Sequence, residues 1–332
     1  MNFSLGLTYQ DITPFIGVSC LFLFLISLFL LSTLWFFQYD FIYPSNVPPK
    51  STENVALPSQ YGLEDFEDVH IKTSDNVIIR GYLLKQNSDS KNSNIDTIVF
   101  LHDNSGNMGH RLPVAKALYD TLKVNIFMLS YRGYGLSQGF AHESGIKKDI
   151  IAALGYLRSN PLTAKSRLII YGQSLGGAVA IDTAAEFESE FSGLIVENTF
   201  KSIPEMFVFS MPWIKWAKLL ISEKWDSEKR IKLIKRTPIL FLSGEIDDYV
   251  PPEHVKSLYD ISCAYSETHV EFHSFKNGRH NNTCTQEGYF ECIKDWWTKN
   301  IASSKPYSPT NIFSNMVPIP ADDADKSKPK SE

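Results

Sequence analysis

Short runs of uninterrupted apolar residues recur along the middle of the chain, and their spacing constrains the fold more than any other feature. Stretches with apolar residues at helical intervals separate these runs. A strand that is apolar on both faces suits the interior of a parallel sheet covered by helices on each side. The runs occupy residues 97–101, 126–129, 168–171, 194–196 and 239–242. The alternation therefore predicts an α/β fold with a mostly parallel central sheet flanked by helices.

Further elements complete this pattern on both sides. Residues 69–73 and 77–84 predict an opening hairpin, because a Ser-Asp-Asn turn separates two β-rich segments. Residues 269–275 predict a last strand and residues 288–299 a last helix. We expect one domain over residues 50–301, with no internal repeat. In such sheets ligands bind where the strands end at their carboxyl termini, so chemistry is expected just after each apolar run.

The amino-terminal end differs from this domain. Residues 15–37 form an apolar run of 23 residues without a charge, after a short segment of residues 1–14. As a helix the run would be about 34 Å long, enough to cross a hydrocarbon core of about 30 Å. A cleaved signal peptide would need a small-residue cleavage site, but Trp35 to Tyr39 follow instead and resemble an interfacial aromatic anchor. We expect a single-pass signal-anchor helix.

The carboxyl-terminal end and the overall charge are simpler to interpret. Residues 302–332 carry Pro, Ser, Asp and Lys with few large apolar groups, which predicts a solvated, disordered tail. The chain has 32 basic and 37 acidic residues and no dense basic block. Nothing in this charge pattern indicates nucleic-acid binding.

A Gly-x-Ser-x-Gly motif follows the run at residues 168–171. The sequence there is Gly172-Gln173-Ser174-Leu175-Gly176-Gly177, and a helix rich in small residues comes next. Between a strand and a helix this motif forms a strained turn that presents the serine, while the glycines remove side chains that would collide. The pattern predicts Ser174 as a nucleophile.

A serine nucleophile needs a base and an acid that orients the base. The chain order expected in this architecture is serine, then aspartate or glutamate, then histidine. An acidic loop with Asp247 and Asp248 follows residues 239–242, and His280 lies in a Gly-containing loop after the last predicted strand. We expect the oxyanion to be stabilised by the backbone N–H groups of Leu175 and Asn104.

With these residues in hand, the chain resembles the α/β-hydrolases. It is similar in particular to the membrane-anchored abhydrolases that include the fungal bud-emergence proteins, a group catalogued as serine-peptidase-like. The resemblance spans residues 15–300 and rests on several segments together. These are the amino-terminal helix, Asn104–Arg111, Tyr131–Gly135, Gly172–Gly177, Glu197–Phe200, Gly244–Pro252 and Gly278–His280.

The resemblance implies roles for individual residues. It implies Ser174 as nucleophile, Asp247 rather than Asp248 as orienting acid, and His280 as base. It also implies a type II topology in an endomembrane such as the endoplasmic reticulum. Relatives carry His-Gly where this chain has His102-Asp103. An inward-facing carboxylate at Asp103 would oppose the negative charge of the oxyanion, and a left-handed backbone there would be strained.

An aromatic insertion occupies residues 200–230, where many α/β-hydrolases place a lid. Its candidate substrate-lining residues are Phe200, Met206, Phe207 and Trp213. One interpretation is that these side chains merely pack on the sheet. The other is an acyl-binding wall or a flap that contacts the membrane, because an aromatic surface suits a lipid-like substrate or the nearby bilayer.

The leading functional hypothesis is a membrane-tethered serine hydrolase of esters, thioesters or amides, acting through an acyl-enzyme. The expected substrate is an acyl ester or thioester, with a lipid or a lipidated protein as candidates, and no cofactor or metal is implied. A catalytically inactive α/β-hydrolase fold that serves as a membrane scaffold is the alternative. A minor alternative is a dinucleotide site at Gly172–Gly177 with Glu197 as its acid, although Ser174 would crowd a pyrophosphate.

Overall fold

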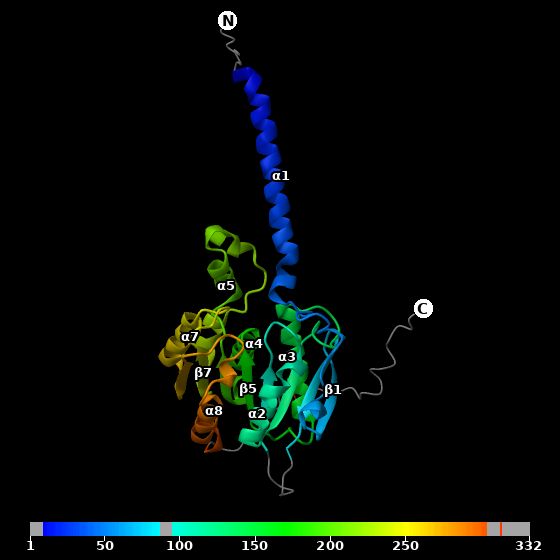
Figure 1. Ribbon diagram of the computed structural model, residues 1–332, viewed down its shortest axis with the longest axis vertical. Coiled ribbons are helices and arrows are strands. Elements are labelled where there is room, and N and C mark those ends of the chain that lie inside the picture. Colours follow the sequence, from blue (N-terminus) through cyan, green and yellow to red (C-terminus); the bar gives the residue numbers. More distant parts are fainter. Residues whose placement is uncertain (1–8, 87–94, 304–312, 314–332) are drawn as a thin grey trace, which may run out of the picture.

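A single sheet of eight strands organises the part of the chain that the structure describes, residues 9–86, 95–303 and 313. In this computed structural model the strand order is β1-β2-β4-β3-β5-β6-β7-β8 (Figure 1). β1 and β2 pair antiparallel, β2 and β4 pair antiparallel, and all later pairs are parallel. The strands are β1 (Phe66–Lys72), β2 (Ile78–Leu84), β3 (Thr97–Leu101), β4 (Asn125–Ser130), β5 (Leu168–Gln173), β6 (Phe191–Glu197), β7 (Ile239–Gly244) and β8 (Val270–Phe275).

Helices connect the strands and cover both faces of the sheet. The α-helices are α1 (Tyr9–Ile42), α2 (Leu112–Leu122), α3 (Glu143–Ser159), α4 (Leu175–Glu186), α5 (Ile203–Ser210), α6 (Ser227–Arg230), α7 (Pro252–Tyr265) and α8 (Tyr289–Trp297). Shorter helical turns are η1 (Pro58–Tyr61), η2 (Met108–Arg111), η3 (Glu188–Glu190), η4 (Pro212–Leu220), η5 (Ile231–Leu233), η6 (Thr283–Thr285) and the π-helical η7 (Thr298–Ala302).

The sheet is apolar on both faces because alternate side chains of each strand enter different cores. In β5, Leu168 and Ile170 pack with α3, α4 and α7, whereas Ile169 and Tyr171 pack with α2 and α8. Alternation is the rule for a β-strand, so a strand between two helical layers must be apolar at every position. The predicted α/β-hydrolase fold is confirmed, with the opening hairpin at β1 and β2.

The apolar amino-terminal helix is longer than the sequence predicts. α1 begins at Tyr9 and ends at Ile42, whereas the apolar run suggested residues 15–37. Its segment Phe15–Ile42 contains an 18-residue stretch with a mean hydropathy of 2.6, and the segment is long and apolar enough to cross a membrane. In Figure 1 this helix projects away from the domain. The extension has a physical cause, because Gln38 and Tyr39 are hydrogen-bonded to Ser222 of the domain.

Two other expectations concern the ends of the domain. Most of residues 302–332 lie outside the described residues. Phe313, however, is buried and its ring lies 5.3 Å from that of Phe187, so the prediction of a wholly solvated tail is wrong at this position.

Candidate active site

Ser174 lies in the turn between β5 and α4, at the carboxyl edge of the sheet. Its backbone has φ 54° and ψ −117°, a conformation that non-glycine residues rarely adopt. The turn is tight because a Cβ on Gly172 would lie 2.1 Å from the carbonyl oxygen of Gly176. Because Gly172 and Gly176 have no side chains, the backbone before Ser174 and the backbone after it can approach each other this closely.

The side chains of Ser174, His280 and Asp247 form one hydrogen-bonded row. Ser174 Oγ lies 2.9 Å from His280 Nε2, and His280 Nδ1 lies 2.8 Å from Asp247 Oδ2. The carboxylate accepts a hydrogen bond, so the proton of the neutral imidazole resides on Nδ1 and Nε2 is free to accept one from the serine. The structure thus brings together three side chains that are distant in the sequence.

Asp247 and Asp248 are adjacent in the sequence but have different environments. Asp247 Oδ1 accepts hydrogen bonds from the backbone N–H groups of Tyr249 and Val250, at 2.8 and 2.9 Å. These bonds fix the carboxylate with its other oxygen toward His280. Asp248 is exposed and pairs with Arg279 at 3.4 Å. Only Asp247 can therefore orient the imidazole.

Of the two backbone N–H groups predicted for the oxyanion, that of Leu175 directly follows the serine, and that of Asn104 belongs to a loop that passes close to the turn. Leu175 is the first residue of α4, where a helix has N–H groups without intrahelical acceptors. A Cβ on Gly176 would lie 2.1 Å from the carbonyl oxygen of Leu101, so the loop after β3, which carries Asn104, runs against the turn. In the described part of the chain, neither N–H has a hydrogen-bond acceptor.

The carboxylate of Asp103 is paired with a cation, so it does not repel an oxyanion as an unpaired carboxylate would. It forms a bidentate pair with Arg111, with Nε–Oδ1 at 3.0 Å and Nη2–Oδ2 at 2.5 Å. The positive charge of the guanidinium offsets the negative charge of the carboxylate. Asp103 is also absent from the residues with positive φ in the described chain, so its backbone requires no glycine.

Sequence reasoning missed the supporting role of the segment that follows β6. Glu197 accepts the backbone N–H of Ser174 at 2.9 Å, and Thr199 Oγ1 donates to the carbonyl oxygen of Ser174 at 2.8 Å. Both bonds hold the strained turn. A Cβ on Gly177 would lie 2.6 Å from Thr199, which explains the second glycine of the pair.

Asn198 joins the loops that carry the acid and the base. Its Nδ2 donates to the carbonyl oxygen of His280 at 3.1 Å and to Thr283 Oγ1 at 2.9 Å. Its Oδ1 accepts the N–H of Gly244, at the end of β7, at 2.9 Å. The sequence signals for this role were the position of Asn198 shortly after a predicted strand and its place in Glu197–Phe200, one of the segments that carry the resemblance.

The side chain of Glu197 is directed into the protein. It is fully buried, and the hydroxyls of Tyr171 and Tyr289 both donate to its Oε2. Burial raises the pKa of this carboxyl, although the two tyrosine bonds act in the opposite direction. A ribose could not reach it, so the dinucleotide interpretation is not supported.

The predicted lining residues of the insertion divide into two groups. Phe200 is buried in the core, and Met206 and Phe207 are half-buried. Trp213 is 74% exposed on η4, so the prediction that it lines an acyl-binding wall is wrong. The physical reason is that the insertion packs on the domain through residues such as Phe200, Met206 and Trp225, whereas the stretch that carries Trp213 leaves this side chain uncovered.

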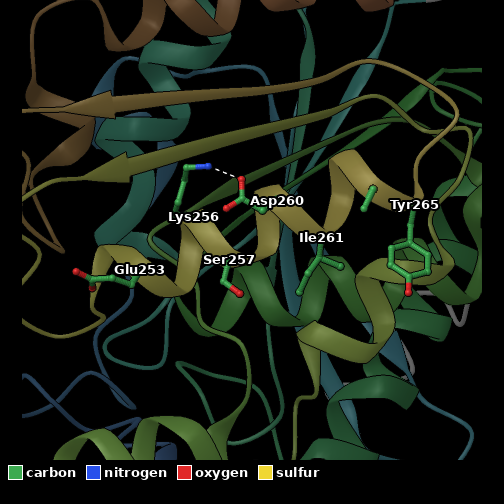
Figure 2. A pocket seen from close by; sticks show the side chains of 7 residues that line it. Glu253, Lys256, Ser257, Asp260, Ile261 and Tyr265 are labelled. Carbon is green, nitrogen blue, oxygen red and sulfur yellow. Dashed lines mark hydrogen bonds and ion pairs between the residues drawn. The ribbon is translucent and has the colours of Figure 1, made fainter.

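Two other kinds of site would compete with this one, a metal cluster and a surface depression. The described residues contain no group of three or more His, Cys, Asp or Glu side chains that could hold a metal. A shallow depression follows one side of α7, lined by Glu253, Lys256, Asp260 and Tyr265 (Figure 2). Figure 2 shows Lys256 pairing with Asp260, one turn further along the same helix. The depression contains none of the three clustered residues.

Comparisons with known proteins agree with this geometry. The model of the prolyl oligopeptidase family matches residues 131–304. The protein bem46 of Schizosaccharomyces pombe is 41% identical over 83% of this chain and 90% of its own length. An uncharacterised membrane protein of Saccharomyces cerevisiae is 34% identical over 80% of this chain and 90% of its own length.

A solved structure shares the fold at low sequence identity. The Pyrococcus furiosus esterase Pf2001 superposes with a TM-score of 0.63 at 19% identity, covering 75% of this chain and 95% of the esterase. The chain therefore belongs to the prolyl oligopeptidase family of α/β-hydrolases.

Proposed function

We propose that this protein is a membrane-tethered serine hydrolase that cleaves an acyl ester or thioester through an acyl-enzyme. The observation that supports this most directly is the row from Ser174 Oγ through His280 to Asp247, with both hydrogen bonds shorter than 3 Å. A serine hydroxyl becomes nucleophilic when a neutral imidazole accepts its proton as it attacks.

The proposed reaction has two halves. His280 Nε2 takes the proton of Ser174 while Oγ bonds to the acyl carbonyl carbon, and the N–H groups of Leu175 and Asn104 stabilise the oxyanion. The imidazolium then protonates the leaving alcohol or thiol, and the C–O or C–S bond breaks. In the second half, water gives a proton to His280 and attacks the acyl-enzyme. The acid product leaves and Ser174 recovers its proton.

Asp247 acts on the imidazole and not on the substrate. Its carboxylate holds the proton on Nδ1 and stabilises the imidazolium that forms in each half-reaction. Tyr249 adds shielding, because its ring centroid lies 5.3 Å from that of His280. No cofactor or metal enters this chemistry.

We further propose that α1 anchors the enzyme in a membrane with type II topology, in an endomembrane such as the endoplasmic reticulum. The supporting observation is the length and hydropathy of Phe15–Ile42. Protease treatment of sealed microsomes carrying a chain with a carboxyl-terminal epitope tests the topology. The proposal expects the epitope to be protected until detergent is added, and digestion without detergent would contradict it.

A fluorophosphonate probe, which labels activated serines, tests the hydrolase proposal. We expect the full chain in detergent micelles to be labelled, and labelling to be lost in Ser174→Ala. Ser137→Ala, a buried serine in the loop after β4, serves as the matched control and should retain labelling. A folded wild-type chain that is never labelled would favour the inactive scaffold instead.

A further inference from the structure

The middle of the insertion, formed by α5 and η4, carries apolar side chains that no part of the described protein covers. Phe209 is 56% exposed, Trp213 74%, Trp216 57% and Leu219 82%. η4 is kinked at Ile214, which follows Trp213. After the kink, Trp216 and Leu219 are three residues apart and align along one side of the 3₁₀ turns, and Ala217, between them, is buried. η4 therefore presents apolar side chains outward on both sides of its kink.

Polar contacts join this insertion to the end of α1. Gln38 Oε1 accepts the backbone N–H of Ser222 at 2.8 Å, and the hydroxyl of Tyr39 lies 3.1 Å from Ser222 Oγ. Trp225 Nε1 donates to the hydroxyl of Tyr43 at 2.8 Å. The position of the insertion relative to α1 is therefore fixed by several hydrogen bonds.

The apolar surface of α1 continues down to these contacts. Phe37 and Phe41, which flank Gln38 and Tyr39, are both exposed. A helix that crosses a membrane has its exposed apolar residues within the bilayer, so the bilayer boundary falls near the level of the insertion. In Figure 1, α5 rises beside α1 at the same end of the domain.

The charges of α5 and η4 are compatible with a membrane surface. Residues 209–220 carry Lys215 and Lys218 and no acidic residue. Lys218 pairs with Glu205 of α5 at 3.3 Å, so Lys215 carries the charge that this pair does not offset. Lysines keep their ammonium groups among lipid headgroups while their methylene chains cover apolar surface. A short helical segment with aromatic residues on one side and lysines beside them is typical of an interfacial segment.

The catalytic residues lie at the same end of the protein. The carbonyl oxygen of Ile42, the last residue of α1, accepts a hydrogen bond from Asn104 Nδ2 at 3.0 Å. Asn104 belongs to the loop that we assign to the oxyanion hole. α5 begins only six residues after β6 ends, next to the segment that holds the Ser174 turn. α1, the insertion and the catalytic edge of the sheet are thus contiguous.

From these contacts we infer that α5 and η4 enter the interfacial layer of the bilayer that α1 crosses, so that acyl substrates reach Ser174 from the membrane. The inference rests on the proposed function for the anchor and for the reaction. The occupant of the apolar face is the phospholipid bilayer, and the substrate class is an acyl chain carried by a membrane lipid or a lipidated protein.

Tryptophan fluorescence in vesicles tests the membrane contact directly. The chain has six tryptophans, of which Trp225, Trp296 and Trp297 are buried. The full chain with Trp35→Phe is placed in dioleoylphosphatidylcholine vesicles, with and without brominated acyl chains. We expect quenching that is lost when Trp213→Phe and Trp216→Phe are added. Equal quenching with and without these two changes would overturn the inference.

A matched reporter controls for nonspecific quenching. Leu162 is partly exposed and lies between α3 and β5, at the amino edge of the sheet. In a chain with Trp35, Trp213 and Trp216 all changed to Phe, Leu162→Trp should restore fluorescence that bromine does not quench. Quenching of this reporter to the same extent would show that the vesicle contact is not confined to the insertion, which contradicts the inference.

A kinetic experiment tests the consequence for substrate delivery. In the chain with Trp213→Ser, Trp216→Ser and Leu219→Ser, hydrolysis of a long-chain acyl ester in vesicles should fall at least about fivefold, because three apolar membrane contacts are lost. Hydrolysis of a water-soluble short-chain ester should stay within about twofold. An equal fall for both esters would overturn the inference. Quenching at the insertion without hydrolysis of either ester would reject the proposed reaction and leave the membrane contact supported.

Discussion

Ser174 is held by its backbone in a conformation that its own side chain does not favour. A residue in such a conformation costs about 1–3 kcal/mol and persists only where its surroundings fix it. Here the backbone N–H and carbonyl of Ser174 are both bonded, to Glu197 and Thr199. The strain therefore serves to aim the hydroxyl at His280.

The assignment of the orienting acid gives a prediction at the residue scale. Asp247→Asn should lower kcat by about 10³-fold or more, because an amide N–H facing Nδ1 forces the wrong imidazole tautomer. Asp248→Asn, one residue away and exposed, should change kcat by less than about twofold. Steady-state kinetics with a soluble ester measure both. If Asp248→Asn lowered kcat and Asp247→Asn left it unchanged, the orienting acid would be Asp248 instead.

Asn198 provides a second prediction, because its side chain links the loops of Asp247 and His280. Asn198→Gly keeps the left-handed backbone of this position, φ 46°, while removing the amide. We expect kcat to fall about 10- to 100-fold, since small displacements of catalytic groups have such effects. The control is Asn160→Gly, at the opposite end of the sheet, which should lower the melting temperature without a change in kcat. An unchanged kcat in Asn198→Gly would contradict this positioning role.

The buried imidazole of His102 leads to a prediction of how the free energy of unfolding depends on pH. Burial lowers the pKa of His102 to about 4, from 6.5. The imidazole of His102 therefore binds a proton below about pH 6.5 in the unfolded chain, but only below about pH 4 in the folded chain. The contribution of the neutral His102 to the free energy of unfolding is fully present above pH 6.5. It is lost as the pH falls toward 4, by about 3 kcal/mol at most.

A variant isolates this contribution. Nδ1 of His102 lies 2.7 Å from the carbonyl oxygen of Asp103, and the amide of Asn can donate the same hydrogen bond. Melting temperatures of the wild type and His102→Asn should converge between pH 7 and pH 4.5. Curves that stay parallel over this range would rule out titration of His102.

At the scale of elements, the contact between α4 and β3 depends on Gly176. A Cβ at this position would lie 2.1 Å from the carbonyl oxygen of Leu101, which belongs to the backbone of β3 and is held in place by the sheet. Gly176→Ala should therefore lower the free energy of unfolding by about 2 kcal/mol or more. Gly17→Ala in α1, where a Cβ meets nothing within 4 Å, is the control. Thermal unfolding in micelles compares them, and equal melting temperatures would contradict this packing.

The elements themselves were largely predictable because their signals are local. Residues 97–101, a threonine followed by four apolar residues, form β3 with those bounds. The end of α1 was not predictable, because its last turn is held by hydrogen bonds to Ser222, about 180 residues further along the chain. The exposure of Trp213 was left open between a residue packed on the domain and a flap residue, since hydropathy alone does not distinguish a covered aromatic residue from an uncovered one.

At the scale of the whole molecule, the sheet brings together residues that are distant in the sequence. Loops after β5, β7 and β8 meet at one edge because the strands are parallel and adjacent. This is why Ser174, Asp247 and His280 could be proposed together from the sequence. The role of Asn198 could not, because it depends on three loops meeting in space.

α1, the insertion and the proposed catalytic edge form a continuous end of the molecule. Asn104 bonds the last residue of α1, and the insertion bonds Gln38 and Tyr43. The proposed hydrolase would therefore act on acyl groups at the surface of the membrane that α1 is proposed to cross.

The acyl-enzyme itself is the most direct test of this account. The full chain is mixed with a p-nitrophenyl acyl ester, quenched in acid within the first turnover and digested for mass spectrometry. The account predicts the acyl mass on the peptide that contains Ser174, and its disappearance in Ser174→Ala. An acyl group on another residue, or steady hydrolysis without any acyl adduct at Ser174, would contradict it.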